Sequence, residues 1–191
     1  MRVLLHTCCG PCASACAPAL AAQGHAVTLF FSNSNIDTED EFERRRVAAA
    51  ALADADGIGF AVDGYDHAAW LENVARGLEA EPEKGARCEK CFRYNLARAA
   101  AYAAANGFDA FATSLTVSPH KVSAQVFAAG RDAAWIAGAK ECGGSSGPAP
   151  AFLEIDFKKK NGFLLSLRRA AELGLYRQSY CGCEFSKRQS R

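Results

Sequence analysis

The stretch VLLHTCCGPCASACAPALAAQGHAVTLFF (residues 3–31) contains two largely apolar runs separated by an alanine-rich segment. The runs at 3–7 and 26–31 predict buried strands, and the segment at about 12–23 predicts a helix between them. The pattern then repeats, with strands predicted at 58–62, 109–115 and 151–156 and helices at about 39–55, 66–77, 89–106, 119–138 and 161–174. Repeated strand–helix units with apolar strands predict an α/β fold, an open parallel sheet with helices on both faces.

The composition indicates a single domain, residues 1–191, that can bury a core without disulfide bonds. A formal net charge of +1 argues against nucleic-acid binding by bulk positive charge but allows a local basic patch. No apolar stretch reaches about 18 residues, so we expect no membrane-spanning helix. The apolar run at the N-terminus is too short for a signal peptide, and we therefore expect a cytoplasmic protein. Nine cysteines in a reducing compartment favour metal binding or redox chemistry over disulfide bonds.

Thiol and polar side chains follow three of the predicted strands. They are Cys8 and Cys9 after the first strand, Asn33 and Asn35 after the second, and Ser114, Thr116 and Ser118 after the fourth. In an open parallel sheet, ligands bind beyond the carboxyl ends of the strands. The helices that return the chain begin on the same edge, including the one near residue 89. We therefore expect these side chains to converge on one ligand site.

The cysteines fall into three groups that are far apart in the sequence. They are Cys8, Cys9 and Cys12, then the Cys-x-x-Cys of Cys88 and Cys91 at the start of a predicted helix, then Cys181 and Cys183. A helix N-terminus stabilises the thiolates that metals and iron–sulfur clusters require. A structural zinc site would leave three or more cysteines unexplained, and a thioredoxin-like dithiol usually follows a first strand. An iron–sulfur or mixed metal site explains most of them, while Cys16 fits the core and Cys142 is incidental.

Eight polar residues are candidates for substrate binding: Asn33, Asn35, Ser114, Thr116, Ser118, Lys121, Arg177 and Gln178. Hydroxyls beside a helix N-terminus suit a ribose or a phosphate, yet Ser118 before Pro119 is also a good helix cap. The two asparagines could equally shape a turn. The candidate catalytic residues are Tyr180 and Cys12. Tyr180 is a better proton donor than His6, which lies within a buried strand and fits a core histidine.

Six segments occur in a characteristic order: HTCCGPC (6–12), NSNI (33–36), EPEKGARCEKCFRYNL (81–96), TSLTVSPHK (113–121), LEIDFKKKNGF (153–163) and GLYRQSYCGCEFS (174–186). This set resembles the QueH-type epoxyqueuosine reductases over roughly residues 2–187. The resemblance implies a Rossmann-like (HUP-like) sheet and the last step of queuosine biosynthesis. In that step the epoxide of epoxyqueuosine, at the wobble position of tRNA, is reduced to the alkene. It also implies a [4Fe–4S] cluster beside a mononuclear iron, without cobalamin.

The resemblance further implies that metal is bound by Cys8, Cys9, Cys88, Cys91, Cys181 and Cys183, with Cys12 also in the site. Some family members have aspartate at the position of Cys12, and either residue can ligate iron. We expect the cluster on Cys8, Cys9, Cys88 and Cys91, and the second iron on Cys12, Cys181 and Cys183. The segment 175–191 would return the last two to the site. A redox-active disulfide between Cys181 and Cys183 is an alternative.

Reduction of an epoxide to an alkene needs two electrons and two protons, so we expect an external one-electron reductant that acts twice or two centres that share the work. Positive charge for tRNA phosphates could come from KKK (158–160) and SKRQSR (186–191), which could equally be ordinary solvated segments. An ATP-using tRNA thiolation enzyme would have a Ser-Gly-Gly-x-Asp-Ser loop where this chain has TCCGPCAS (7–14). A structural zinc-binding module is the non-enzymatic alternative. The loop 142–150 is expected to be a surface elaboration.

Overall fold

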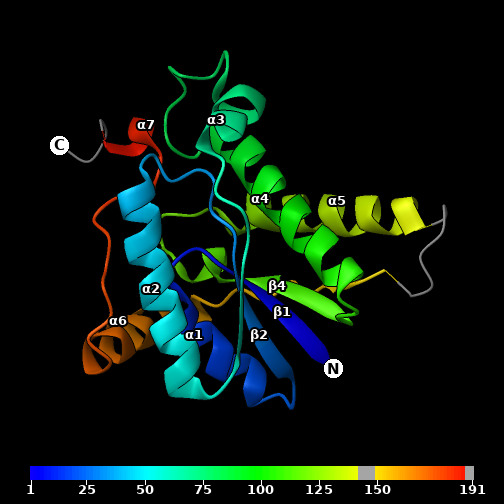
Figure 1. Cartoon of the computed structure of the whole chain (residues 1–191), viewed down its shortest axis with the longest axis vertical. Coiled ribbons are helices and arrows are strands. Elements are labelled where there is room, and N and C mark those ends of the chain that lie inside the picture. Colours follow the sequence, from blue (N-terminus) through cyan, green and yellow to red (C-terminus); the bar gives the residue numbers. More distant parts are fainter. Residues whose placement is uncertain (142–148, 188–191) are drawn as a thin grey trace.

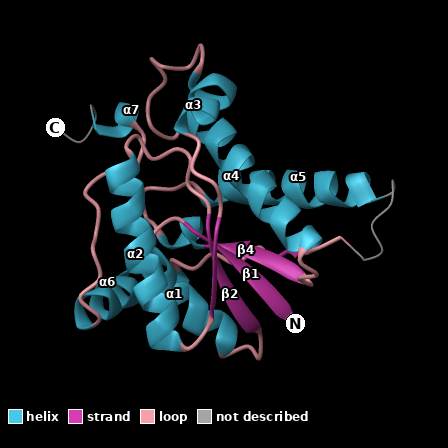
Figure 2. Ribbon diagram, in the orientation of Figure 1, coloured by secondary structure: helices cyan, strands magenta, loops and turns pink. Residues whose placement is uncertain are grey.

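Five parallel strands form one sheet in the order β3-β2-β1-β4-β5 (Figures 1 and 2). They are β1 (Arg2–Thr7), β2 (Ala26–Phe31), β3 (Gly59–Val62), β4 (Ala110–Thr113) and β5 (Ala151–Phe152). The structure is a computed structural model that describes residues 1–141 and 149–187. The strand order reverses at β1, with β2 and β3 on one side of it and β4 and β5 on the other. This order is the Rossmann-like one and confirms the predicted fold class.

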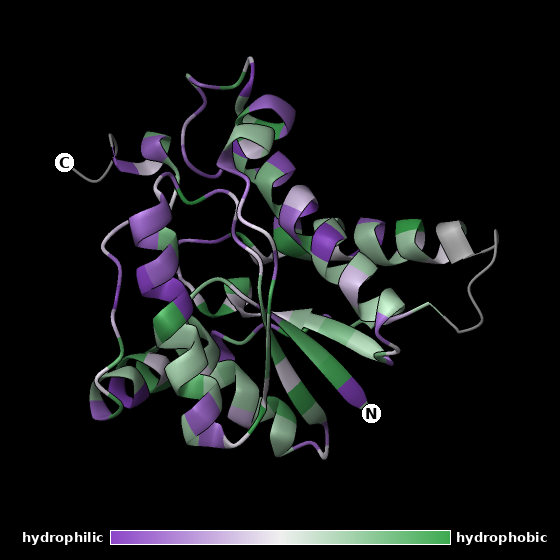
Figure 3. Ribbon diagram, in the orientation of Figure 1, coloured by the Kyte–Doolittle hydropathy of each residue, from purple (hydrophilic) through white to green (hydrophobic). Residues whose placement is uncertain are grey.

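Helices cover both faces of the sheet (Figure 2). On one face lie α1 (Gly10–Ala21), α2 (Glu39–Asp56) and α6 (Gly162–Glu172), and on the other lie α4 (Ala86–Ala105) and α5 (Ser123–Glu141). Successive residues of β1 serve the two faces, because Val3 and Leu5 belong to the core beneath α1 and Leu4 to the core beneath α4. The hydrophobic strands at the centre of Figure 3 therefore supply both halves of the core.

The first turn of α2 is fixed at the carboxyl edge of the sheet. The Thr38 hydroxyl caps the helix by accepting the Glu41 N–H at 3.3 Å. Acidic residues occupy the first turn, and Gly57, at φ +63°, ends the helix in the left-handed conformation. This start at residue 39 agrees with the prediction and places charged side chains of α2 beside the C-terminal part of the chain.

Two predicted strands are shorter than the sequence suggests. β4 ends at Thr113, because the Thr113 hydroxyl accepts the Leu115 N–H and begins the 3-10 helix η2 (Ser114–Val117). β5 has only two residues, because the chain then turns, with the Ile155 N–H donating to the carbonyl of Leu153. Both strands therefore give way early to loops that carry polar side chains toward the sheet edge.

Some helices also differ from the predicted ones. α5 begins at Ser123, because residues 118–121 form a turn in which the Ser118 hydroxyl accepts the His120 N–H at 3.2 Å. The predicted helix at 66–77 is a short α3 (His67–Trp70) followed by a π-helical turn (Leu71–Ala75). The sequence did not indicate η3 (Lys159–Asn161) or α7 (Glu184–Lys187). No helix in the described part of the chain is long and apolar enough to cross a membrane. Cys142 and most of the loop 142–150 lie outside the described residues.

Candidate functional site

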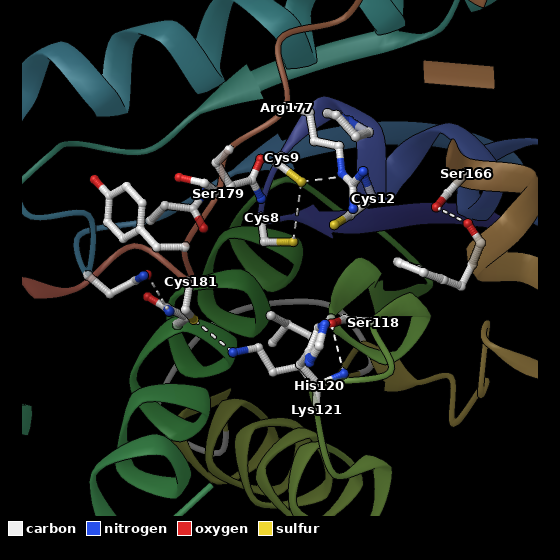
Figure 4. A pocket seen from close by; sticks show the side chains of 18 of the residues that line it. Cys8, Cys9, Cys12, Ser118, His120, Lys121, Ser166, Arg177, Ser179 and Cys181 are labelled. Carbon is white, nitrogen blue, oxygen red and sulfur yellow. Dashed lines mark hydrogen bonds between the residues drawn. The ribbon is translucent and has the colours of Figure 1, made fainter. Parts of the chain in front are cut away.

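A cavity of about 280 Å³ lies at the carboxyl edge of the sheet, beyond the ends of β1 and β4 (Figure 4). Its wall comes from the loops after β1 and β2, the segment after η2, the helices α4 and α6, and the C-terminal segment. The cysteines on this wall are Cys8, Cys9, Cys12, Cys91 and Cys181. The strand order reverses between β2 and β4, and such a switch point is where open α/β sheets bind their ligands.

Cys8, Cys9 and Cys12 form one compact group, whose Sγ atoms all lie within 4.8 Å of one another. Cys9 is the N-cap of α1, and its Sγ accepts the Cys12 N–H at 3.3 Å. The Sγ atoms of Cys8 and Cys9 are 4.0 Å apart. A cap and the residue three positions later face each other at a helix start. The spacing of these cysteines therefore brings three thiols to one point, where they could hold one metal ion.

The thiols of this group differ in acidity. Burial opposes ionisation of Cys9, but hydrogen bonds from Cys12, Cys8 and Gln178 outweigh it and lower the pKa of Cys9 well below its usual value. The hydrogen bond with Cys12 lowers the pKa of Cys8, but the hydrogen bond with Cys9 and burial outweigh it and raise that pKa to about 11. Cys9, at the helix N-terminus, is therefore the first thiolate of the group, and thiolate is the metal-binding form.

Ser114 and Thr116 hold the framework of the site. The Ser114 hydroxyl accepts the Cys8 N–H at 3.1 Å and donates to Cys8 Sγ at 3.4 Å. The Thr116 hydroxyl donates to the Ile155 carbonyl at 2.8 Å and accepts the Phe157 N–H at 3.3 Å. Both residues are fully buried, and neither belongs to the described lining of the cavity. We therefore assign them structural roles in place of the predicted contacts with substrate.

A Ser114→Ala variant is expected to be less stable and to bind metal less well at the Cys8 group. The substitution leaves the buried Cys8 N–H without an acceptor, which costs about 1–3 kcal/mol. Urea unfolding and the iron content after anaerobic reconstitution would measure the two effects. Ser118→Ala is the matched control, because it removes a hydroxyl from a half-exposed turn. Equal stability of the two variants would contradict the role given to Ser114.

Cys88, Cys91, Cys181 and Cys183 form a second group, supplied by α4 and the C-terminal segment. Cys91 and Cys181 line the cavity, while Cys183 packs in an apolar cluster around Trp70 that also contacts Cys91. Burial raises the pKa of Cys91, and the charges of Cys181, Cys183 and Cys88 raise it further. The start of α4 therefore does not by itself make Cys91 a thiolate, contrary to the sequence-based expectation. A bound cation would be needed to do so.

Lys121 brings positive charge to this second group. Its Nζ donates to Cys181 Sγ at 2.7 Å (Figure 4). Burial lowers the pKa of Lys121, but the charge of Cys181, the hydrogen bond to its sulfur and the charges of Cys88 and Cys91 outweigh burial and raise it. Lys121 also lies on the cavity wall. It therefore places a positive charge beside Cys181 at a position where a substrate could also contact it.

Asn33 and Asn35 line the cavity, and hydrogen bonds within the protein fix their side chains. The Asn33 side-chain amide donates to the Thr7 carbonyl at 2.9 Å, and Asn35 Oδ1 accepts from Asn95 Nδ2 at 3.1 Å. Asn95 also donates to Cys91 Sγ at 3.6 Å and lines the cavity. The sequence reasoning overlooked Asn95. Its position one helical turn after Cys91 could have indicated it, because such residues share a helix face.

The C-terminal segment places Arg177, Gln178 and Tyr180 on the cavity wall, and Ser118 lies on that wall as well. The Tyr180 hydroxyl donates to Asp37 Oδ1 at 2.6 Å, and burial and Asp37 raise the pKa of Tyr180. A phenol that holds its proton more firmly is a weaker acid. The geometry therefore favours Tyr180 as a fixed part of the wall over the predicted proton donor.

His6 and Cys16 are core residues, as predicted. His6 is fully buried, and its ring nitrogens contact Thr113 Oγ1 at 2.9 Å and the Ser32 carbonyl at 3.1 Å. Burial lowers the pKa of His6, which favours the neutral ring. Cys16 is buried, and its thiol donates to the Cys12 carbonyl at 3.2 Å. Neither belongs to the described lining of the cavity.

The fold and the site together define a Rossmann-like α/β protein with a cysteine-lined ligand cavity at the switch point of its sheet. The family model described as epoxyqueuosine reductase QueH matches residues 3–189. The chain belongs to the QueH family, which confirms the resemblance seen in its sequence.

Relatives in several bacteria carry the name epoxyqueuosine reductase QueH. The protein of Streptococcus pyogenes serotype M1 is 36% identical over 190 residues, covering 96% of this chain and 69% of the relative. The protein of Acinetobacter baylyi is 34% identical over 189 residues, which cover 99% of this chain and 82% of the relative. The protein of Thermotoga maritima is 30% identical over 189 residues, which cover 96% of this chain and 89% of the relative. The similarity therefore extends over almost the whole of this chain.

Proposed function

We propose that this protein reduces epoxyqueuosine to queuosine in tRNA, the final step of queuosine biosynthesis, and does so in the cytoplasm, where tRNA is found. The observation that carries the proposal is the cysteine-lined cavity at the switch point of a chain that the family model covers from residue 3 to residue 189. The reaction consumes two electrons and two protons, converts the epoxide to an alkene and releases the oxygen as water. An external one-electron reductant supplies the electrons.

The residues around the second cysteine group suit an anionic metal cluster. Arg87 is buried at the start of α4, and its charge acts on both Cys88 and Cys183. Its Nη1 donates to backbone carbonyls of the loop 78–81, but Nε and Nη2 have no hydrogen-bond partner in the described structure. Buried donors of this kind are costly unless an acceptor is bound. Sulfur atoms of an anionic cluster would supply such acceptors, and Lys121 adds a second cation.

The compactness of the first cysteine group supports a different division of ligands from the one expected from the sequence. Cys12 lies with Cys8 and Cys9, all within 4.8 Å, and not with Cys181. Cys181 lines the cavity together with Cys91, and Cys91 packs against the apolar cluster that contains Cys183. We therefore assign the mononuclear iron to Cys8, Cys9 and Cys12. The [4Fe–4S] cluster is assigned to the four thiols of the second group.

When bound, the iron would act as a Lewis acid toward the epoxide oxygen and the cluster would supply single electrons. The protein residues bind and orient the modified base between the two groups of thiols. Asn33, Asn35 and Asn95 form one polar wall, and Arg177 and Gln178 face the same cavity. Phe92, Leu115 and Leu167 supply its apolar surface. A cavity of about 280 Å³ has room for one nucleobase, so the base would have to leave the anticodon stack to enter it.

Basic residues near the cavity are suited to hold the tRNA backbone. Arg177 is exposed on the wall, and Lys159 and Lys160 are exposed just before α6. Lys158 is committed to the fold, because its Nζ donates to the Lys121 carbonyl at 2.9 Å. Lys187 pairs with Asp37, and the tail beyond residue 187 lies outside the described residues. Phosphate contacts are therefore assigned to Arg177, Lys159 and Lys160.

The function is tested by mass analysis of tRNA nucleosides from a bacterial strain that lacks its cobalamin-dependent reductase and accumulates epoxyqueuosine. Expression of this protein is expected to convert epoxyqueuosine to queuosine, whereas a Cys9→Ser variant of equal abundance should leave epoxyqueuosine in place. Persistence of epoxyqueuosine with the unaltered protein would contradict the proposal. Protein that binds zinc alone after anaerobic reconstitution with iron and sulfide would favour a structural zinc module.

A further inference from the structure

The C-terminal segment that carries Cys181 and Cys183 runs from α6 to α7 beside the first turns of α2 (Figure 1). Residues 175–183 form neither helix nor strand, so no regular backbone ladder fixes the two thiols. Their positions depend instead on side chains of α2 and of the loop that precedes it. Two charged side chains of α2, Arg45 and Glu41, are almost fully buried there.

The Arg45 side chain forms hydrogen bonds with the backbone of this segment. Its side chain is 2% exposed, and its Nε donates to Glu41 Oε1 at 2.7 Å. Nη1 donates to the Cys181 carbonyl at 2.9 Å, and Nη2 donates to the Tyr180 carbonyl at 3.4 Å. The guanidinium also lies over the Tyr180 ring, 5.0 Å from its centroid. One planar group therefore binds a carboxylate, two successive carbonyls and an aromatic face at once.

The loop before α2 also contacts this segment, at Gly182. The Gly182 carbonyl accepts the Asp37 N–H at 3.0 Å. Gly182 has a φ of +145°, and a Cβ placed there would lie 2.7 Å from Asn35 Nδ2. The chain is thus held between Arg45 and the loop 33–37 immediately beside Cys181. A change in either contact would move both cysteines relative to α4.

We propose that Arg45 is a positioning residue that sets the place of the Cys181 and Cys183 thiols opposite the Cys-x-x-Cys of α4. Charge alone does not suffice for this role, because a lysine ammonium cannot reach two successive carbonyls and a carboxylate in one plane. Glu41 orients the guanidinium, and its Oε2 accepts the Tyr176 hydroxyl at 2.8 Å, which fixes the start of the segment. The consequence for metal binding rests on the proposed function, whereas the position of the thiols does not.

The test measures alkylation of Cys181 by iodoacetamide in metal-free protein, by mass spectrometry of its peptide, with Cys8 as the internal reference. Arg45→Lys is expected to make Cys181 react about tenfold faster than in the unaltered protein, because two hydrogen bonds to its segment are lost. Cys8 should react at an unchanged rate. Arg46→Lys is the control, because Arg46 lies on the same helix but pairs with the exposed Glu43. A wild-type rate at Cys181, or an equal increase at Cys8, would overturn the proposal.

Two further variants keep the test independent of folding failure and of the proposed function. Glu41→Gln combined with Arg45→Met removes both buried charges and avoids leaving one unpaired, and it should also speed alkylation of Cys181. Gly182→Ala should do the same through the contact with Asn35. After reconstitution, Arg45→Lys is expected to lose iron from the second cysteine group only. If the unaltered protein binds no iron, the proposed function fails while the alkylation rates still decide the role of Arg45.

Discussion

Cys181→Ser is expected to lose most of the iron of anaerobically reconstituted protein, leaving about one iron per chain and little visible absorption. Cys12→Ser is expected to do the reverse and retain about four irons with the brown colour of the cluster. Iron and sulfide analysis, together with the visible spectrum, would measure both. The physical reason is the proposed division of ligands, in which Cys181 acts with Cys91, on the same cavity wall, and Cys12 acts with Cys9.

The Cys181→Ser variant distinguishes the division of ligands expected from the sequence from the division proposed from the structure. If Cys181 shared the mononuclear iron with Cys12, as the sequence suggested, Cys181→Ser would keep the cluster and its colour. Cys16→Ser is the matched control, because Cys16 is a buried thiol whose hydrogen bond to the Cys12 carbonyl a serine hydroxyl can replace. That variant should bind as much iron as the unaltered protein. Equal losses from Cys12→Ser and Cys181→Ser would contradict both divisions and indicate one shared centre.

The fold was predictable because its strands are nearly uniform apolar runs. β1 and β2 fall within one residue of their predicted limits, since residues buried on both faces must be apolar throughout. β4 and β5 were predicted too long for a local reason. A threonine can continue a strand or cap a turn. The Thr113 hydroxyl accepts a hydrogen bond from the Leu115 N–H, and this bond stabilises the turn. The pattern of hydrophobic residues does not distinguish a strand that continues past Thr113 from one that ends there.

The convergence of the candidate side chains on a cavity at the sheet edge was predictable, but the hydrogen-bond partners of several of them were not. Parallel strands end at one edge, so topology alone brings Cys8, Asn33 and the start of α4 together. Ser114 and Thr116 stand at the right edge, yet a hydroxyl there can bind a ligand or a neighbouring backbone group. Their partners are more than 35 residues away, 106 in the case of Ser114 and Cys8. The local sequence pattern carries no information about hydrogen bonds between residues so far apart in the chain.

Arg45 illustrates the same limit in a helix. It stands four residues after Glu41, a spacing that also occurs on exposed helix faces. Both side chains are almost fully buried, because the C-terminal segment lies over them. A sequence shows the ion pair but not what covers it. The clearest sequence signals of the candidate site are the cysteines, because clustered cysteines in a reducing compartment have few structural explanations.

Gly10→Ala is expected to lower the free energy of unfolding by about 2–3 kcal/mol and the melting temperature by roughly 5–10 °C. A Cβ at residue 10 would lie 2.5 Å from the carbonyl oxygen of Ala48 and 2.8 Å from its carbonyl carbon. Both atoms belong to the backbone of α2, so no side chain can move aside. Alanine gains about 1 kcal/mol in helix propensity over glycine, which is smaller than the cost of separating two packed helices.

The same substitution is expected to disrupt the first cysteine group. Gly10 lies between Cys9 and Cys12, so a shift of α1 away from α2 moves both thiols relative to Cys8. Thermal unfolding followed by circular dichroism, and the iron content of the reconstituted variant, would measure the two effects. Gly64→Ala is the control, because a Cβ at Gly64 meets no atom within 4 Å, and it should change stability by less than about 0.5 kcal/mol. Equal melting temperatures for the two variants would show that α1 can move from α2 without cost, and that close contact does not fix the thiols.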